Sequence, residues 1–172
     1  MRLFHVSEEA DIPVFHPRTP SRPDLDPNIP LIWAIDEAHL PNFLTPRDCP
    51  RVTYHAGPQT TPEDASLFFS SAVQHVVVIE QKWFEIMKNT TLYLYEFDPS
   101  DFELQDAVAG YYVAKSTQVP IGKYRIDDLF AALFQRGVEL RIVENLWPLR
   151  DRVLGSSLNF SFCRMAFAQP RK

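Results

Sequence analysis

The chain contains little of what marks a secreted, zinc-binding or membrane protein. Its 172 residues include two cysteines, Cys49 and Cys163, too few for a disulfide framework or a zinc knuckle, so we expect reduced thiols. No stretch approaches the roughly 18 consecutive apolar residues that a membrane span needs. Residues 1–5 lack the charged and then apolar pattern of a secretory leader. These absences predict a cytoplasmic protein without a membrane segment.

Basic charge and glycine are also scarce. The net charge of −5 argues against nonspecific binding of nucleic acid, because such binding needs a basic field. With five glycines the chain has no glycine-rich phosphate loop, so the letters DEAH at Asp36–His39, which spell a box of helicase motors, do not predict a motor. The spacing of His5, His16, Asp36 and His39 fits no metal-ligand motif, and no metal site is predicted.

What the chain does contain is typical of a folded protein. Hydrophobic residues make up 45% and charged residues 23%, which are ordinary globular values, and the length fits a single domain over residues 1–172. Eleven of the 15 prolines lie between Pro13 and Pro62. Because each proline removes a backbone donor and fixes φ, the first third of the chain is expected to be rich in loops.

Apolar runs and turn residues predict the elements. Strands are clearest at residues 3–6, 31–35, 75–79 and 91–97, and a long final strand is predicted at 158–167. Roughly eight strands with short helices among them indicate an α+β domain with a mixed, mostly antiparallel sheet. Residues of continuous or periodic apolar runs are expected in the core, namely Trp33, Ile35, Val76, Val78, Ile79, Leu129 and Leu133.

Three helices have recognisable starts. Thr61 and Pro62 predict a cap and a first turn for a helix that runs to about residue 70. Asp36 is expected to cap a short helix over residues 37–43, and Asp127 a helix that Gly137 closes.

The opening of the chain resembles a known fold. Leu3–Ser7, with the letters LFHVS, is similar to the first strand of the ADP-ribosyltransferase-like fold, which often reads L-[WY]-H-G-[ST]. A second segment, Tyr111–Val119, is similar to the late strand of that fold, E-Y-x-V-x-x-x-x-Q-V. The resemblance implies that His5 and Ser7 hold a nicotinamide ribose or its equivalent, and that both segments flank one cleft.

The catalytic glutamate of that fold has no counterpart here. Depending on the alignment its place falls on Gly110 or Tyr111, and neither is acidic. In the transfer of ADP-ribose the glutamate hydrogen-bonds a ribose hydroxyl and orients the acceptor, so a site without it is expected to bind but to transfer slowly. The catalytic residues, the cofactor and the existence of an enzymatic activity are therefore left open.

Arginine is the abundant basic residue, with 12 arginines among the 17 basic side chains. The guanidinium group suits two-pronged recognition of phosphate. RNA 2′-phosphotransferases, which share the fold that the chain resembles, use arginines and a histidine around a phosphate. The sequence places four arginines in loops or near helix ends, at Arg18, Arg47, Arg51 and Arg150.

Two hypotheses follow from these observations. In the first, the protein binds a nucleotide or another phosphate-bearing small molecule, with NAD-related compounds among the candidates. The residues expected to bind it are His5, Ser7, Arg18, Arg47, Arg51, Tyr111, Tyr112 and Arg150. In the second, it is a noncatalytic module that binds a protein partner and keeps a vestigial pocket. The whole chain is also similar to a family of uncharacterised bacterial proteins that open with LFHxSEE and contain WAID and PLRD segments, and that family brings no activity with it.

Overall fold

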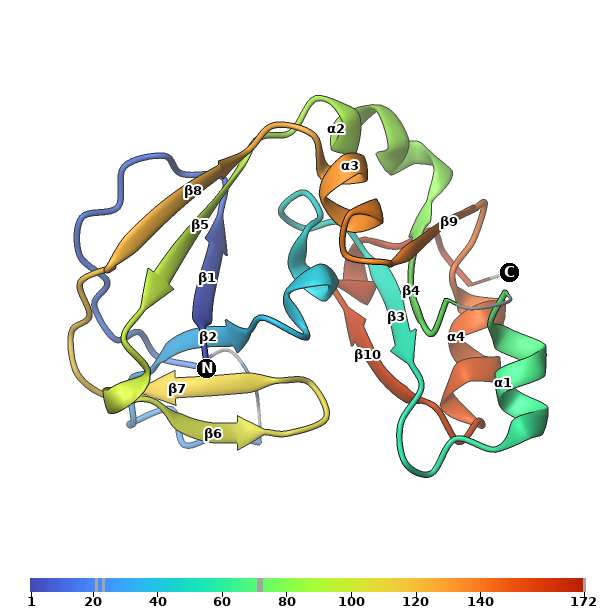
Figure 1. The fold of residues 1–172 in the computed structure, drawn as a ribbon, viewed down its shortest axis with the longest axis horizontal. Coiled ribbons are helices and arrows are strands. Elements are labelled where there is room, and N and C mark those ends of the chain that lie inside the picture. The colour runs from blue at the N-terminus through green and yellow to red at the C-terminus, as the bar shows by residue number, and fades with distance from the viewer. Residues whose placement is uncertain (21, 23, 71–72, 172) are drawn as a thin grey trace. The chain divides into compact units, whose positions relative to one another are not determined.

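The computed structural model describes residues 1–20, 22, 24–70 and 73–171. The chain divides into two compact units, each built from two separate stretches of sequence (Figure 1). Unit 1 comprises Met1–Leu40 and Leu92–Ile126, and unit 2 comprises Pro41–Thr91 and Asp127–Lys172. The described residues contain ten mostly antiparallel strands in two sheets and four short α-helices, which confirms the α+β class.

Unit 1 is a six-stranded sheet in which every neighbouring pair is antiparallel. Its strands, in the order in which they pair, are β6 (Glu103–Asp106), β7 (Tyr111–Ala114), β2 (Ile32–Asp36), β1 (Leu3–Ser7), β5 (Leu92–Phe97) and β8 (Gly122–Ile126). The segments Leu3–Ser7 and Tyr111–Val119 thus begin on strands of one sheet, with β2 between them.

Strands β1 and β2 pair at one end and then part. Their register joins Leu3 to Asp36 and Phe4 to Ile35. Beyond these residues β1 continues along β5 as far as Ser7, while β2 continues along β7 as far as Ile32. In Figure 1, β1 accordingly points away from β2. The sheet is therefore two three-stranded halves joined at a corner.

The proline-rich connection between β1 and β2 covers the inner face of this corner. Phe15 forms a bridge with Gln118, and Arg18 forms one with Leu31, through pairs of backbone hydrogen bonds of 2.8–3.0 Å. The Phe15 ring lies 5.2 Å from the ring of Tyr95 and 5.0 Å from that of Phe97. It belongs to a buried cluster of both halves, composed of Leu3, Phe15, Ile32, Ala34, Tyr95, Phe97, Phe102 and Ala114.

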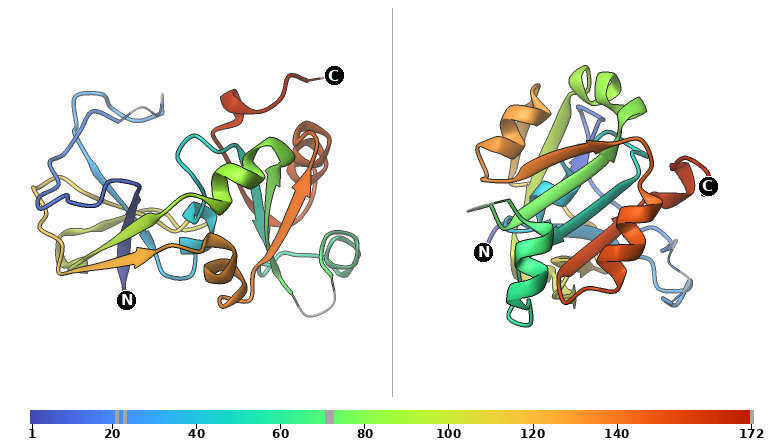
Figure 2. Two further views of the ribbon diagram at one scale, coloured as in Figure 1. Left: turned by 90° about the horizontal axis from the view of Figure 1, so that it is seen from above. Right: turned by 90° about the vertical axis from the view of Figure 1, so that its right-hand side faces the viewer.

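Unit 2 is a four-stranded sheet with helices on both faces. Its strands pair in the order β10 (Asn159–Cys163), β3 (Arg51–His55), β4 (His75–Glu80) and β9 (Glu139–Val143), and β4 runs parallel to β9. Figure 2 shows α1 (Pro62–Phe68) and α4 (Trp147–Leu154) on one face, and α2 (Phe84–Lys88) and α3 (Leu129–Phe134) on the other. The sandwiched β4 explains why residues 76–79 form a continuous apolar run, which is typical of a strand covered on both faces.

Local signals placed most elements, with three corrections. The Thr61 side chain accepts the Asp64 N–H and caps α1, as predicted. The helix predicted over residues 37–43 is instead a turn followed by a 3-10 helix at Leu40–Phe43, because Pro41 cannot donate a helical hydrogen bond. The cap of α3 is Asp128 rather than Asp127. The final strand ends at Cys163, since Arg164 adopts a left-handed φ of 56°.

The predicted core is confirmed with one exception. Six of its seven residues are at most 4% exposed, whereas Trp33 is half-buried. The reason is its place on β2, beyond the point where β1 departs. Among the described residues, no helix is both long enough and apolar enough to cross a membrane.

Candidate ligand-binding site

His5 stands where β1 and β2 separate. Its Nδ1 lies 3.0 Å from the backbone oxygen of Trp33, on β2. A carbonyl oxygen only accepts, so Nδ1 carries the proton, and the Nε2 atom of the neutral ring is left with an acceptor lone pair. At this point β1 and β2 no longer pair with each other. The His5 ring therefore donates to the Trp33 oxygen in place of a β1 backbone group.

The environment keeps this ring neutral. Burial lowers the pKa of His5 below its usual value of 6.5, and the positive charge of Arg18 lowers the pKa further. The hydrogen bond to Trp33 acts in the opposite direction but does not outweigh burial. A neutral imidazole with a fixed tautomer suits contact with a ligand hydroxyl, which can donate to Nε2.

Neighbouring aromatic side chains fix the position of the ring. Phe15 packs against His5 with ring centroids 4.9 Å apart. Tyr95 lies opposite His5 in the β1–β5 register, so both side chains emerge on the same face. The Tyr95 hydroxyl donates to the backbone oxygen of Glu9 at 2.6 Å and accepts from the N–H of Ile12 at 3.2 Å. One buried tyrosine thus anchors the loop that borders the histidine.

Ser7 is on the same face as His5, because strand side chains alternate with a period of two. Its Oγ accepts the backbone N–H of Glu9 at 3.0 Å, in the turn that ends β1. The hydroxyl proton is not used by that contact and can be donated to a ligand.

Arg18 is exposed beside this face. Its backbone is fixed by the two hydrogen bonds to Leu31. Within the described part of the chain, the Arg18 guanidinium makes no ion pair. Its positive charge contributes to lowering the pKa of His5. A cation that is anchored through its backbone and open at its side chain is suited to binding an anion.

The two adjacent tyrosines on β7 lie on opposite faces of the sheet. Tyr112 pairs with Ala34 and packs against the buried cluster on the His5 face. Tyr111 points to the other face, where its ring contacts Trp33 at a centroid distance of 5.3 Å. Tyr112 thus lies on the sheet face that carries His5 and Ser7, whereas Tyr111 lies on the opposite face.

Gly110, one of the two positions that the resemblance offers for a glutamate, is closed to any side chain. Gly110 has φ of 70°, and a Cβ atom there would overlap the imidazole ring of His39. That ring is held by Asp36, whose Oδ1 is 2.7 Å from Nδ1 and accepts the backbone N–H of His39 at 2.8 Å. The sequence predicted Asp36 as a helix cap and excluded the DEAH letters as a motor box, but it did not indicate the contact between Asp36 and the His39 ring.

The other three predicted arginines belong to unit 2. Arg47 is exposed, and Arg51 is buried and donates to the backbone oxygens of Asn42 at 2.6 Å and Cys49 at 3.0 Å. Arg150 is 3.1 Å from Asp151 and lies over the ring of Phe162. The prolines near Arg51 in the sequence are a signal for this structural role. Each proline lacks a backbone N–H, so a buried carbonyl oxygen near it needs another donor, such as a guanidinium.

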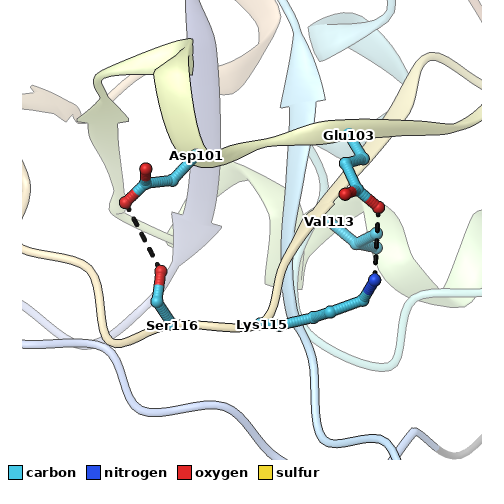
Figure 3. Close-up of a pocket in the computed structure, with 5 residues that line it drawn as sticks. All are labelled: Asp101, Glu103, Val113, Lys115 and Ser116. Atoms are coloured by element: carbon cyan, nitrogen blue, oxygen red, sulfur yellow. Dashed lines mark hydrogen bonds and ion pairs between the residues drawn. The ribbon is translucent and has the colours of Figure 1, made fainter.

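Two shallow hollows were not indicated by the sequence. One, of about 270 Å³, lies on unit 1 and is lined by Asp101, Glu103, Val113, Lys115 and Ser116 (Figure 3). Its polar groups bond one another, with Lys115 to Glu103 at 3.3 Å and Ser116 to Asp101 at 3.4 Å. The other, of about 400 Å³, lies on unit 2. Within the described ranges, no three His, Cys, Asp or Glu residues are placed to hold a metal ion.

Comparison with known proteins identifies the family. The model of a family of unknown function, DUF6886, matches residues 4–168, nearly the whole chain, and the chain belongs to that family. No curated protein and no solved structure matches it. The expectation of an uncharacterised family is confirmed to this extent.

Proposed function

We propose that unit 1 binds a nucleotide, or another small molecule that carries both a hydroxyl-bearing sugar and a phosphate, against the face formed by His5, Ser7, Arg18 and Tyr112. The observation that carries this proposal is the hydrogen bond between His5 and Trp33, because it fixes Nε2 as an acceptor. A sugar hydroxyl donates to such an atom, and a phosphate oxygen does not.

Arg18 supports the phosphate part of the proposal. Its anchored backbone and exposed guanidinium provide charge-assisted donors beside the histidine. The guanidinium groups of Arg51 and Arg150 already make contacts within unit 2, so the proposal does not include these two residues. Tyr111 is left out because it faces the opposite side of the sheet.

The resemblance to the ADP-ribosyltransferase-like fold supports the sugar part. In that fold the first-strand histidine and hydroxyl hold a ribose, and His5 and Ser7 occupy those places in the LFHVS segment. The blocked Gly110 position favours binding over transfer, because no carboxylate can be placed there without moving His39. The proposal is therefore recognition of a ligand of the chemical class of NAD, and no reaction is assigned.

The test is a titration with NAD, ADP-ribose, ADP and the phosphate-free nucleoside adenosine, followed through the midpoint of thermal unfolding. A ligand that prefers the folded state at about ten times its dissociation constant raises the midpoint by roughly 3–6 °C in a chain of this length. The proposal expects such a rise with a phosphate-bearing ligand and a smaller rise with adenosine.

Matched variants connect the result to the site. His5→Gln and Arg18→Ala should each reduce the rise, whereas His16→Ala and Arg47→Ala, which alter an exposed histidine and an exposed arginine, should leave it unchanged. If no ligand raises the midpoint at about millimolar concentration, the nucleotide proposal fails and the protein-binding hypothesis replaces it. Equal effects of Arg18→Ala and Arg47→Ala would also contradict the assignment of the site.

A further inference from the structure

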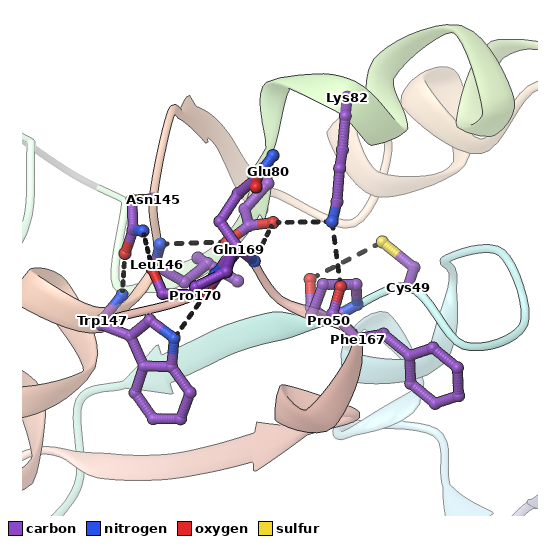
Figure 4. Close-up of polar contacts among 10 residues, drawn as sticks. All are labelled: Cys49, Pro50, Glu80, Lys82, Asn145, Leu146, Trp147, Phe167, Gln169 and Pro170. Atoms are coloured by element: carbon purple, nitrogen blue, oxygen red, sulfur yellow. Dashed lines mark hydrogen bonds and ion pairs between the residues drawn. The ribbon is translucent and has the colours of Figure 1, made fainter. Parts of the chain in front are cut away.

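Residues Phe167–Arg171, here called the closing segment, lie along unit 2 and are held there by side chains of its body (Figure 4). Lys82 Nζ donates to the backbone oxygen of Phe167 at 3.0 Å. Trp147 Nε1 donates to the oxygen of Gln169 at 2.8 Å, and Asn145 Nδ2 donates to the oxygen of Pro170 at 3.0 Å. Three side chains of unit 2 thus bind three backbone oxygens of the closing segment.

A buried carboxylate fixes the middle of the closing segment. Glu80 is fully buried, and both its oxygens accept the backbone N–H of Gln169 at 3.0 Å. It also accepts the N–H of Leu146 at 3.3 Å and lies 3.6 Å from Lys82 Nζ. Because a buried charge without donors is costly, the Gln169 contact is expected to persist.

The last described residue of this segment is held in a different way. The guanidinium of Arg171 lies 4.5 Å above the centroid of the Trp147 ring and donates through two nitrogens to Asp151, each bond 2.9 Å long. The Arg171 and Asp151 side chains are 55% and 44% exposed, so their pair adds little to stability. Arg171 can therefore swing away while Glu80 keeps its donors.

The surroundings of Arg171 have the chemistry of an arginine-binding subsite. A flat aromatic ring supports the plane of the guanidinium, and a carboxylate receives two of its parallel N–H bonds. The hollow of about 400 Å³ is lined by Glu144, Asn145, Trp147, Pro148, Asp151 and Arg171. Two acidic side chains at this hollow, in a chain with a net charge of −5, complement a cationic ligand.

We propose that the Trp147 ring and the Asp151 carboxylate, which line this hollow, form a subsite for an arginine side chain of a partner protein, and that Arg171 occupies this subsite in cis until the partner displaces it. The exchange costs little, since it replaces one exposed guanidinium by another and leaves the backbone contacts of the closing segment in place. Lysine is a poorer occupant, because an ammonium group lacks the planar fork that meets Asp151 while stacking on Trp147.

The experiment uses N-acetyl-L-arginine amide as the probe and follows the indole N–H resonance of Trp147 by NMR, assigned with Trp147→Phe. In Arg171→Ala the probe should shift this resonance saturably. In the wild-type chain it should bind about two- to fivefold more weakly, because the weak, exposed contact of Arg171 must open before the probe can bind. Asp151→Asn combined with Arg171→Ala should abolish binding, and N-acetyl-L-lysine amide should bind several-fold more weakly than the arginine probe.

Arg150→Ala is the matched control. It removes a second arginine 3.1 Å from Asp151 without vacating the Trp147 ring, so it should bind the probe like the wild type. The altered residues of the other variants are at least partly exposed, and an unchanged thermal midpoint verifies that they fold. Equal affinities for wild type and Arg171→Ala, or retention of binding without the Asp151 carboxylate, would overturn the proposal. So would the absence of any saturable shift in Arg171→Ala.

Discussion

Gly110 and His39 approach each other so closely that a Cβ atom on Gly110 would overlap the imidazole ring. The backbone of Gly110 also has φ of 70°, in the left-handed region that side chains other than glycine rarely adopt. The backbone oxygen of Gly110 accepts the N–H of Asp36, the residue that holds the His39 ring. Two segments of unit 1, at Asp36–His39 and at Gly110, can therefore pack together only because position 110 has no side chain.

Gly110→Ala should lower the free energy of unfolding by about 2–4 kcal/mol, the sum of a left-handed backbone cost and an overpacking cost. Gly137→Ala is the matched control, because Gly137 has φ of 68° but open space around it. It should cost about 1–2 kcal/mol, from the backbone alone. Urea unfolding measures both. Equal losses would show that the His39 ring yields freely, and recovery in the double variant Gly110→Ala, His39→Ala would demonstrate the clash.

The neutral state of His5 predicts a pH dependence of stability. Its pKa in the folded chain lies below 6.5, chiefly because of burial, so the unfolded chain binds the proton more readily. The contribution of His5 is complete above about pH 6.5 and is lost as the pH falls from there toward the folded pKa. Urea unfolding from about pH 5 to 8 should show this loss in the wild type.

The variant His5→Gln isolates this contribution from that of the other four histidines. Its free energy of unfolding should fall less steeply with decreasing pH than that of the wild type. An NMR titration of the His5 ring in the folded protein should give a midpoint below 6.5. A midpoint above that value, or parallel pH profiles of the two proteins, would contradict the neutral ring.

Local sequence signals were sufficient for most elements and insufficient for the arrangement that creates the candidate site. The strand at Leu3–Ser7 followed from its apolar run, yet nothing in that run shows that β1 leaves β2 after Phe4. The separation of the two strands is a tertiary feature. It allows the His5 ring to hydrogen-bond the backbone oxygen of Trp33. The histidine was therefore predictable, whereas its partner was not.

The division into units was hidden for a related reason. The chain passes between units after Leu40, Thr91 and Ile126, so neither unit is a continuous segment with its own composition. Arg51 shows the same limitation at a single side chain. An arginine among prolines suggested a loop and anion binding, whereas Arg51 begins strand β3. Its guanidinium donates to the backbone oxygens of Asn42 and Cys49.

Glu80→Gln tests whether the buried Glu80 carboxylate holds the closing segment through the Gln169 N–H. A glutamine offers one acceptor oxygen, and its amide N–H₂ would face the donors of Gln169 or Lys82. We expect a loss of about 2–4 kcal/mol in the free energy of unfolding, because charged hydrogen bonds are lost in a buried place. Faster exchange of the Trp147 indole proton should accompany it, since this proton bonds Gln169.

The matched control is Glu85→Gln. Glu85 has a side chain that is 71% exposed and lies 4.0 Å from Lys88, so the change should alter stability by less than about 0.5 kcal/mol. If Glu80→Gln is equally mild, the closing segment is held by its other contacts and the buried carboxylate has a smaller role than its three backbone contacts indicate.

Arg51→Ala separates a structural arginine from a ligand-binding one. The Arg51 side chain is buried, donates to two backbone oxygens and lies 5.0 Å from the ring centroid of Phe43. Truncation leaves both oxygens in a buried place without this donor, so we expect a loss of about 2–4 kcal/mol in the free energy of unfolding. Arg47→Ala, four residues away and exposed, should change the free energy of unfolding by less than about 0.5 kcal/mol.

Urea unfolding measures the free energy of unfolding of both variants. A titration of the wild type and of Arg51→Ala with phosphate supplies the second readout. The opposite result has two parts: Arg51→Ala is as stable as the wild type, and phosphate stabilises the wild type but not the variant. That result would show that Arg51 binds a ligand and does not hold the backbone of Asn42 and Cys49.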